Sequence, residues 1–268
     1  MSIYLYGLLP TIQLKQTPFR AVKGIDKLNT CIETFEEVSV VFCRLTDEEF
    51  AEPVLQVKMK DPKWIHKQAM HHHETIVAYS KNYLFLPTKF CTIYSCVEKL
   101  REDIMQKQTD IVTLFDNLKE KEEWNVKMYY EKSRFFKHFE EHSNVIKIMK
   151  DDLKHLPPGK QFFMKKKQGQ MIEIEAQNEL LLLSQNLENL LLKETVGNKT
   201  RENWSRNATG KNMDMIYNST ALVPIEKIQR FEELINEFVQ MYEEKGISIE
   251  LSGPWPFYHF ASLDDRTV

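Results

Sequence analysis

The first 120 residues alternate between short apolar runs and longer segments with helical periodicity. Residues 3–8 and 89–94 are rich in strand-forming residues, and residues 38–43 are apolar on both faces, which favours an interior strand. Asp61-Pro62 is typical of a helix start, because aspartate caps the first turn and proline fits into it. Apolar residues at three-four spacing over 97–118 predict a second helix, interrupted only at Lys107. This half therefore predicts the order β-β-α-β-α.

The second half also contains strand-like alternation and helical three-four spacing, but in a different order along the chain. We predict strand, helix, strand, strand, helix and strand over residues 124–130, 161–196, 200–206, 213–223, 224–245 and 247–251. This order is that of the ferredoxin-like split βαβ, with a charged, helix-prone insertion after residue 130. A charge run over 119–123 separates the halves. We therefore predict an α+β protein with an N-terminal domain (1–120) and a ferredoxin-like βαββαβ domain with extra helices (121–268).

Composition and charge narrow the classes of partner. Among the 268 residues, 36 basic and 39 acidic side chains give a net charge of −3, so nothing global favours nucleic acid or an anionic membrane surface. No stretch approaches the roughly 20 apolar residues of a membrane span, and residues 1–10 do not resemble a signal peptide. The four cysteines lack a CxxC pair and suit buried, reduced thiols. We expect a cytoplasmic protein without direct membrane insertion.

The clearest candidate for chemistry is the run His71-His72-His73-Glu74. His66 shares a helix face with His73, but their seven-residue spacing puts them about two turns, roughly 10 Å, apart. A metal-dependent enzyme that uses His66 and His71 to His73 is the alternative function that this cluster suggests. Successive helical residues point about 100° apart, however, and cannot converge on one ion. Packing histidines are the simpler interpretation. With no GxSxG, P-loop or GxGxxG in the sequence, we predict no catalytic residue, no metal and no cofactor.

A basic cluster, Lys165-Lys166-Lys167, follows the aromatic pair Phe162-Phe163. Such a mixture occurs in RNA-binding proteins, and a ferredoxin-like domain is one fold that binds RNA. The simpler interpretation is a solvated helix face, because the overall charge is near neutral and the aromatic ribonucleoprotein motifs are missing from the predicted strands. We therefore predict no nucleic-acid partner.

Two segments are candidates for contact with a partner protein. Four consecutive leucines, 180–183, cannot all face one sheet, so some of this helix is available for docking. The octad at 253–260 holds a tryptophan extended between two prolines, so the chain should leave the sheet here with its aromatic rings. Those rings need a groove on this protein or on a partner. The candidate partner-binding residues are Leu182, Leu183, Leu187, Trp255, Phe257, Tyr258 and Phe260.

Several segments, in order along the chain, resemble the gas vesicle GvpF/GvpL family. They are YLYGL at 4–8, HHHET at 71–75, LPTKFCTIY at 86–94, EWNVK at 123–127, PGKQFF with KKK at 158–167, and GPWPFYHF at 253–260. The sequences of the segments HHHET, KFCTIY and EEWNVK resemble GvpL most. Cys91 stands where many members of the family have glycine.

This resemblance implies a non-enzymatic, cytoplasmic accessory protein of gas vesicle formation with two α+β domains. It also implies two kinds of partner, the small hydrophobic shell protein GvpA and other gas vesicle accessory proteins. A role in assembly or a place as a minor shell component follows from the same resemblance.

Overall fold

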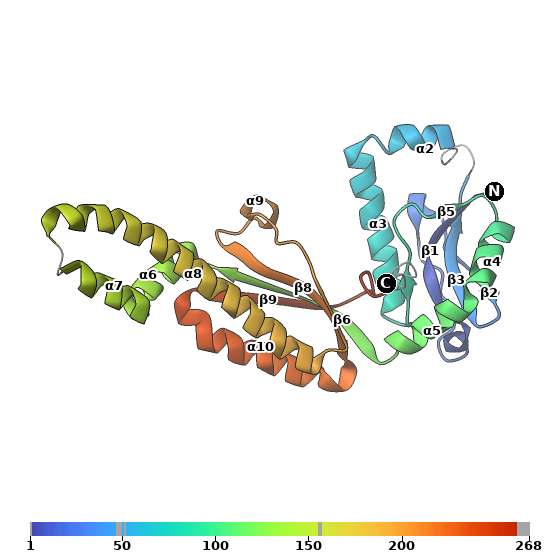
Figure 1. The fold of residues 1–268 in the computed structure, drawn as a ribbon. Coiled ribbons are helices and arrows are strands. Elements are labelled where there is room, and N and C mark those ends of the chain that lie inside the picture. The colour runs from blue at the N-terminus through green and yellow to red at the C-terminus, as the bar shows by residue number, and fades with distance from the viewer. Residues whose placement is uncertain (1, 47–49, 51, 155–156, 262–268) are drawn as a thin grey trace. The chain divides into compact units, whose positions relative to one another are not determined.

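The computed structural model describes residues 2–46, 50, 52–154 and 157–261, which divide into two compact units (Figure 1). One unit combines Met1–Lys121 with Trp255–Val268, and the other is Glu122–Pro254. The chain mixes helices and strands, and both sheets contain antiparallel strand pairs. The predicted second domain extends to residue 268, whereas this division places the residues from Trp255 on with the first unit.

The first unit is a sheet between two layers of helices. The strands run in the order β2-β3-β1-β4, and β5 also pairs with β1. Helix α3 packs on one face of β1, and α4 and α5 contact the strands from the other side (Figure 1). The elements are β1 (Ile3–Pro10), η1 (Thr11–Lys15), η2 (Ile25–Lys27), β2 (Cys31–Phe35), β3 (Val38–Arg44), α2 (Glu52–Lys58), α3 (Pro62–Ser80), β4 (Leu86–Pro87), β5 (Ile93–Tyr94), α4 (Val97–Gln106) and α5 (Gln108–Leu118).

Local sequence explains most of these elements. Both β1 and β3 are interior strands, and their side chains are buried on both faces, as the apolar run of β3 predicts. The Asp61 carboxylate accepts from the backbone N–H of Lys63 at 2.9 Å, which confirms the predicted helix cap. The predicted helix over 97–118 is two helices, because Lys107 has φ −101° and ψ 7° and breaks the regular turn.

Two expectations for the first unit need correction. Strand β2 lies in a stretch that the hydrophobic pattern did not assign, and it pairs with β3 from Cys31 opposite Phe42. The predicted strand over 89–94 is reduced to β5, because the chain turns at Cys91, whose φ is 62°. A non-glycine residue rarely adopts this left-handed conformation. The observed backbone therefore gives a physical reason for glycine to be favoured at position 91.

The second unit is a four-stranded sheet with the order β7-β8-β6-β9. Helices α8 and α10 lie side by side on one face of it, and α6 and α7 extend from the chain between β6 and α8 (Figure 1). The elements are β6 (Lys121–Tyr130), α6 (Lys132–His142), α7 (Asn144–Lys154), α8 (Pro158–Glu194), β7 (Gly197–Thr200), α9 (Arg206–Thr209), β8 (Asp214–Pro224), η3 (Ile225–Lys227), α10 (Ile228–Tyr242), η4 (Glu243–Lys245) and β9 (Ile247–Trp255).

The core of this unit lies between the helices and one face of the sheet. Alternate residues of β6, namely Trp124, Val126 and Met128, point into it, as the strict alternation of this strand predicts. The predicted strand over 200–206 is shifted: β7 ends at Thr200, and the chain then leaves the sheet for a connection that contains α9. Gly246 has φ 78° and ends the turn η4 after α10, as the sequence predicts.

Strand β9 is longer than the pattern predicts. It continues through Gly253 and Pro254 to Trp255, although proline cannot donate to a sheet. Since β9 stands at the edge of the order β7-β8-β6-β9, one side of the strand needs no donor, and proline is tolerated there. In the described part of the chain, no helix is both long and apolar enough to cross a membrane.

A pair of leucines on α8 tests this packing. Leu187 is 1% exposed in the core, whereas Leu182 on the same helix is 54% exposed. Both changes to alanine remove the same atoms and gain the same helix propensity. We expect Leu187→Ala to lower the free energy of unfolding by about 2–5 kcal/mol and Leu182→Ala to change it by roughly 0.5 kcal/mol or less. Urea unfolding followed by circular dichroism measures both, and equal losses would contradict the assigned orientation of α8.

Candidate functional site

The three consecutive histidines of α3 point toward three different parts of the first unit. His72 is buried against β1, with its Nδ1 2.9 Å from the Tyr4 hydroxyl and its ring stacked on Tyr6. Its Nε2 lies 3.1 Å from the carbonyl oxygen of Thr88. A carbonyl oxygen only accepts, so Nε2 carries the hydrogen and Nδ1 accepts from Tyr4. Both ring nitrogens of a neutral His72 are therefore engaged within the fold.

The other two histidines hold segments that are distant in sequence. His71 donates from Nε2 to the carbonyl oxygen of Gly24. His73 lies on another face of the helix, where its Nδ1 is 2.7 Å from the Tyr258 hydroxyl. Its ring centroid is also 6.0 Å from that of Trp255. The histidine run and the C-terminal octad, two separate motifs of the sequence, are thus in direct contact in the first unit.

The geometry of the histidines decides what chemistry they can perform. His66 and His71 line one hollow of about 700 Å³ together with Asp26 and Glu74. His72 and His73 face elsewhere, so the hollow brings His66 together with His71 and not with His73, the histidine whose face His66 is predicted to share. Among the described residues, no group of three or more His, Cys, Asp or Glu side chains is placed to hold a metal ion. The three histidines therefore connect α3 to three different segments by separate hydrogen bonds.

The C-terminal octad divides into a buried part and an exposed part. Phe257 and the preceding Pro256 are buried, and Phe260 is half-buried. Trp255 and Tyr258 both keep more than a third of their surface in solvent while they contact His73. The predicted partner-binding residues of this segment therefore differ in access: only Trp255 and Tyr258 present large aromatic surface.

The leucine-rich helix shows the same division. Leu183 and Leu187 belong to the core of the second unit, so in this fold their side chains offer no surface to a partner. Leu182 points into solvent, as does Leu181 beside it. The prediction that four consecutive leucines cannot all face one sheet is confirmed, since 180 and 183 are buried and 181 and 182 are exposed. The side chains of 162–168, which include the basic cluster, lie outside the described part.

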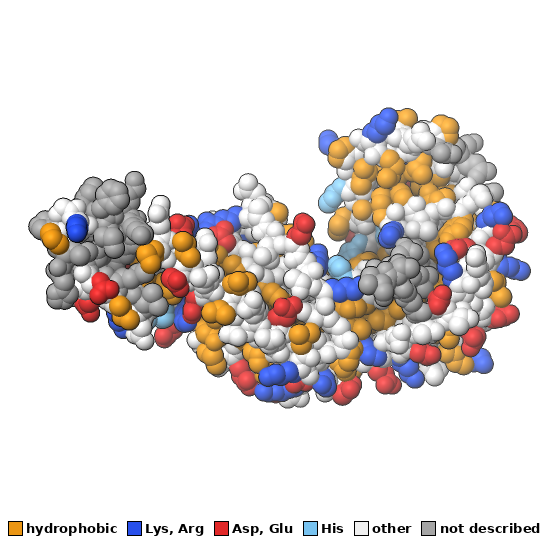
Figure 2. Space-filling view, in the orientation of Figure 1, with side chains coloured by type: hydrophobic (Ala, Val, Ile, Leu, Met, Phe, Trp, Pro, Cys, Tyr) orange, Lys and Arg blue, Asp and Glu red, His pale blue; other side chains and the backbone are white. Residues whose placement is uncertain are grey.

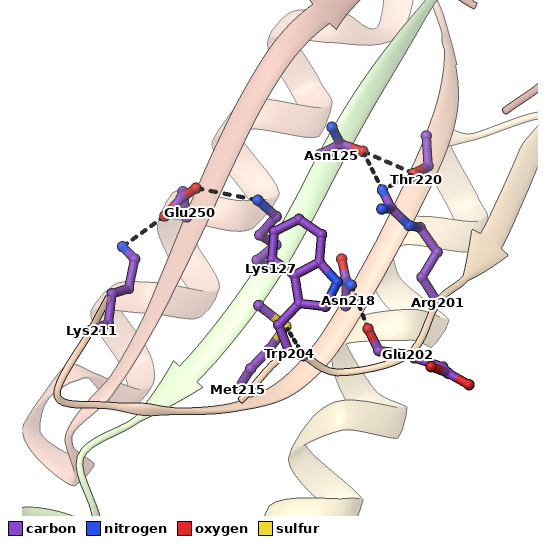
Figure 3. A network of polar contacts seen from close by, with 10 residues as sticks. All are labelled: Asn125, Lys127, Arg201, Glu202, Trp204, Lys211, Met215, Asn218, Thr220 and Glu250. Carbon is purple, nitrogen blue, oxygen red and sulfur yellow. Dashed lines mark hydrogen bonds and ion pairs between the residues drawn. The ribbon is translucent and has the colours of Figure 1, made fainter. Parts of the chain in front are cut away.

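A polar network that the sequence did not reveal covers the other face of the second sheet (Figure 3). Glu250 of β9 lies 2.7 Å from Lys211 and 3.6 Å from Lys127 of β6. The Lys211 ammonium, which donates to Glu250, holds the pKa of that carboxyl below its ordinary value. The Nζ of Lys127 also lies 4.6 Å from the ring centroid of Trp204.

The remainder of the network ties the connection between β7 and β8 to the sheet. Arg201 lies within 3.4 Å of both Asn125 and Thr220, and Thr220 donates to Asn125 at 2.8 Å. Asn218, which is fully buried, donates to the backbone carbonyl of Glu202 at 2.7 Å. These contacts hold the connection against the sheet, while the Oδ1 of Asn218 is buried without a hydrogen-bond partner. The alternation of β6 and β9 indicates the strand residues, but Trp204 falls within the predicted strand 200–206 that the structure does not contain, and Lys211 falls outside both predicted strands.

Comparisons with known proteins agree with this fold. The family model described as "Gas vesicle synthesis protein GvpL/GvpF" matches residues 2–262. Among solved structures, the gas vesicle protein GvpF from Anabaena sp. PCC7120 is similar at 16% identity, with 98% of each chain covered and a TM-score of 0.71. GvpF from Microcystis aeruginosa is similar at 18% identity over 98% of this chain and 99% of that chain, with a TM-score of 0.64. No curated protein matches the sequence.

The chain is thus an α and β protein of the type found in these gas vesicle proteins, and it belongs to the GvpL/GvpF family of gas vesicle synthesis proteins. The family model covers both GvpL and GvpF, so the greater likeness to GvpL stays a prediction.

The buried histidine makes stability depend on pH. Burial lowers the pKa of His72 to about 4 from its ordinary 6.5. In the unfolded chain the His72 imidazole is protonated below about pH 6.5, whereas in the folded chain it is protonated only below about pH 4. The free energy of unfolding therefore decreases as the pH falls from 6.5 to 4. We expect His72 to account for a loss of about 2 kcal/mol between pH 7.5 and pH 5.0.

Urea unfolding of the wild type and of His72→Gln at both pH values measures this loss. His72→Gln should have the smaller pH dependence, even if its stability is lower throughout, and the exposed-site control His66→Gln should keep that of the wild type. An undiminished pH dependence in His72→Gln would show that this histidine titrates as if exposed.

Proposed function

We propose that this protein is an accessory factor of gas vesicle formation that binds the hydrophobic shell protein, of the GvpA type, and other accessory proteins. It acts in the cytoplasm in association with gas vesicles, either during assembly or as a minor component of the shell. The observation that carries this proposal is the match of the gas vesicle synthesis family over residues 2–262. The likeness of the fold to two GvpF proteins over nearly the whole chain supports it.

A physical argument supports the chaperone-like part of the proposal. A subunit that assembles into a gas-filled wall exposes a large apolar surface before assembly, and such surfaces aggregate. This protein carries exposed apolar side chains that could cover part of such a surface. They include Leu182 on α8 in the second unit, and Trp255 and Tyr258 in the first unit. Of the other candidates, Leu183, Leu187 and Phe257 support those surfaces from within the fold, and Phe260 is half-buried.

We propose a non-enzymatic role and a ferredoxin-like second domain as part of the same account. The divergence of His71, His72 and His73 supports binding over catalysis, because each ring is held by a different neighbour. The chain order β6-α8-β7-β8-α10-β9, together with the sheet order β7-β8-β6-β9, supports a ferredoxin-like βαββαβ arrangement. The division near residue 121 supports two domains.

Co-expression with a tagged shell protein of the GvpA type tests the proposal. We expect this chain to co-purify with the tag and to increase the amount of soluble shell subunit. Trp255→Ser with Tyr258→Ser, and separately Leu181→Ser with Leu182→Ser, should reduce that amount if the exposed side chains form the contact. Met241→Ser, at an exposed apolar site on α10, is the matched control.

If the shell protein fails to bind this chain while it binds another accessory protein, direct shell contact is wrong. The protein would then be a scaffold that contacts only other accessory proteins.

A further inference from the structure

Helix α8 is apolar on two opposite faces. One face, formed by Ala176, Leu180, Leu183, Leu187 and Leu191, is buried in the core of the second unit. The other face carries Met171, Ile174, Leu181, Leu182 and Leu192, which are between 38% and 58% exposed. In Figure 2, hydrophobic side chains are interspersed with uncharged and acidic ones along the course of this helix. We call these five exposed side chains the outer seam.

The spacing of the outer seam matches one partner helix. Met171, Ile174, Leu181 and Leu192 fall on a line of alternating three- and four-residue steps, on which Asn178, Gln185 and Glu188 occupy the other positions. Such a line is the a/d pattern of a two-helix seam, which is narrower than the face that a helix presents to a sheet. It extends for about 32 Å at 1.5 Å per residue. This length and width suit a single long helix.

The charged side chains that α8 itself contributes around the seam have one sign. Residues 168–192 contain four glutamates and no lysine or arginine. Glu175 stands four residues after Met171 and borders the seam, whereas Glu188, four residues before Leu192, stands on the line of the seam near its end. The Glu188 carboxylate accepts from the neutral Thr200 hydroxyl at 3.0 Å, a contact that leaves its charge in place. Glu179 and Glu173, in contrast, have basic partners, Lys245 at 2.9 Å and Lys132 at 3.8 Å.

We propose that the outer seam of α8 binds an amphipathic helix of another protein whose apolar stripe is flanked by lysine and arginine. Complementary charges beside an apolar seam set both partner choice and orientation. A second copy of α8 is disfavoured, because it would bring a basic-free, glutamate-bordered face against an identical one. This inference rests on the proposed function, in which the helix belongs to a gas vesicle protein, and it adds the chemistry of the contact.

Two synthetic peptides test the contact without any gas vesicle partner. Both have 21 residues and the same leucine seam at a and d, and they carry either lysine or glutamate at the flanking e and g positions. Fluorescence anisotropy with the full chain at low salt should give a Kd about 10-fold lower for the lysine peptide than for the glutamate peptide. The difference should shrink at high salt, because these charges are exposed.

Variants of the chain distinguish binding at the outer seam from non-specific attraction between opposite charges. Ile174→Ser with Leu181→Ser should weaken binding of the lysine peptide about 10-fold, whereas Met241→Ser, also exposed, should leave it unchanged. Glu175→Lys with Glu188→Lys should remove the preference for the lysine peptide. Glu232→Lys with Glu237→Lys on α10 makes the same change in net charge and should preserve it.

Three results would overturn the inference. They are equal affinity for the two peptides, an affinity unaffected by the serine changes on α8, or a loss of preference in the α10 charge control. Sedimentation that showed self-association, reversed by Leu181→Ser, would instead assign the seam to a second copy of this chain. The peptide experiment contains no shell protein, so a negative result would contradict this inference without contradicting the binding of the shell protein, which the co-expression experiment tests.

Discussion

The burial of one stripe of α8 against the second sheet is the constraint on which that unit depends. The stripe recurs at every third or fourth residue from Ala176 to Leu191, so it meets the sheet along one line of the helix. Alternate residues of β6 and the apolar face of α10 complete the same core. Since a helix presents only one side to a sheet, burying Leu180 and Leu183 obliges Leu181 and Leu182 to face solvent. Core and outer seam are two consequences of one leucine run.

The first unit depends in a similar way on the directions of adjacent helical side chains. Three neighbouring histidines on α3 reach the loop at Gly24, strand β1 with Thr88, and the C-terminal segment at Tyr258. The central ring is enclosed by tyrosines, and burial lowers its pKa, so it acts as a neutral polar link. The three consecutive histidines suggest a metal site in the sequence, but helical geometry points their side chains in different directions. In the structure they therefore contribute to packing.

Elements governed by local rules could be predicted from the sequence, and elements governed by distant partners could not. The cap at Asp61, the end of η4 at Gly246 and the buried run of β3 follow from the residues themselves. Strand β2 depends on pairing with β3, and the left-handed turn at Cys91 depends on the surrounding chain. The sequence places the candidate leucines on one helix, as the structure has them. Which of their side chains are buried and which are exposed depends on where the sheet lies, and the sequence does not show this. Trp204 and Lys211 join the network of Figure 3 only because the connection after β7 folds back.

An exposed apolar seam about 32 Å long carries a risk, because unpartnered apolar surface favours self-association. The charges around it reduce that risk selectively. Glutamates border the seam and no basic residue lies between 168 and 192, so two identical helices would repel one another. A helix with basic flanks would gain both the apolar contact and the opposite charges. Glu175 and Glu188, the two glutamates that discourage a second copy, therefore also define the partner for which the seam is suited, and specificity follows from charge more than from shape.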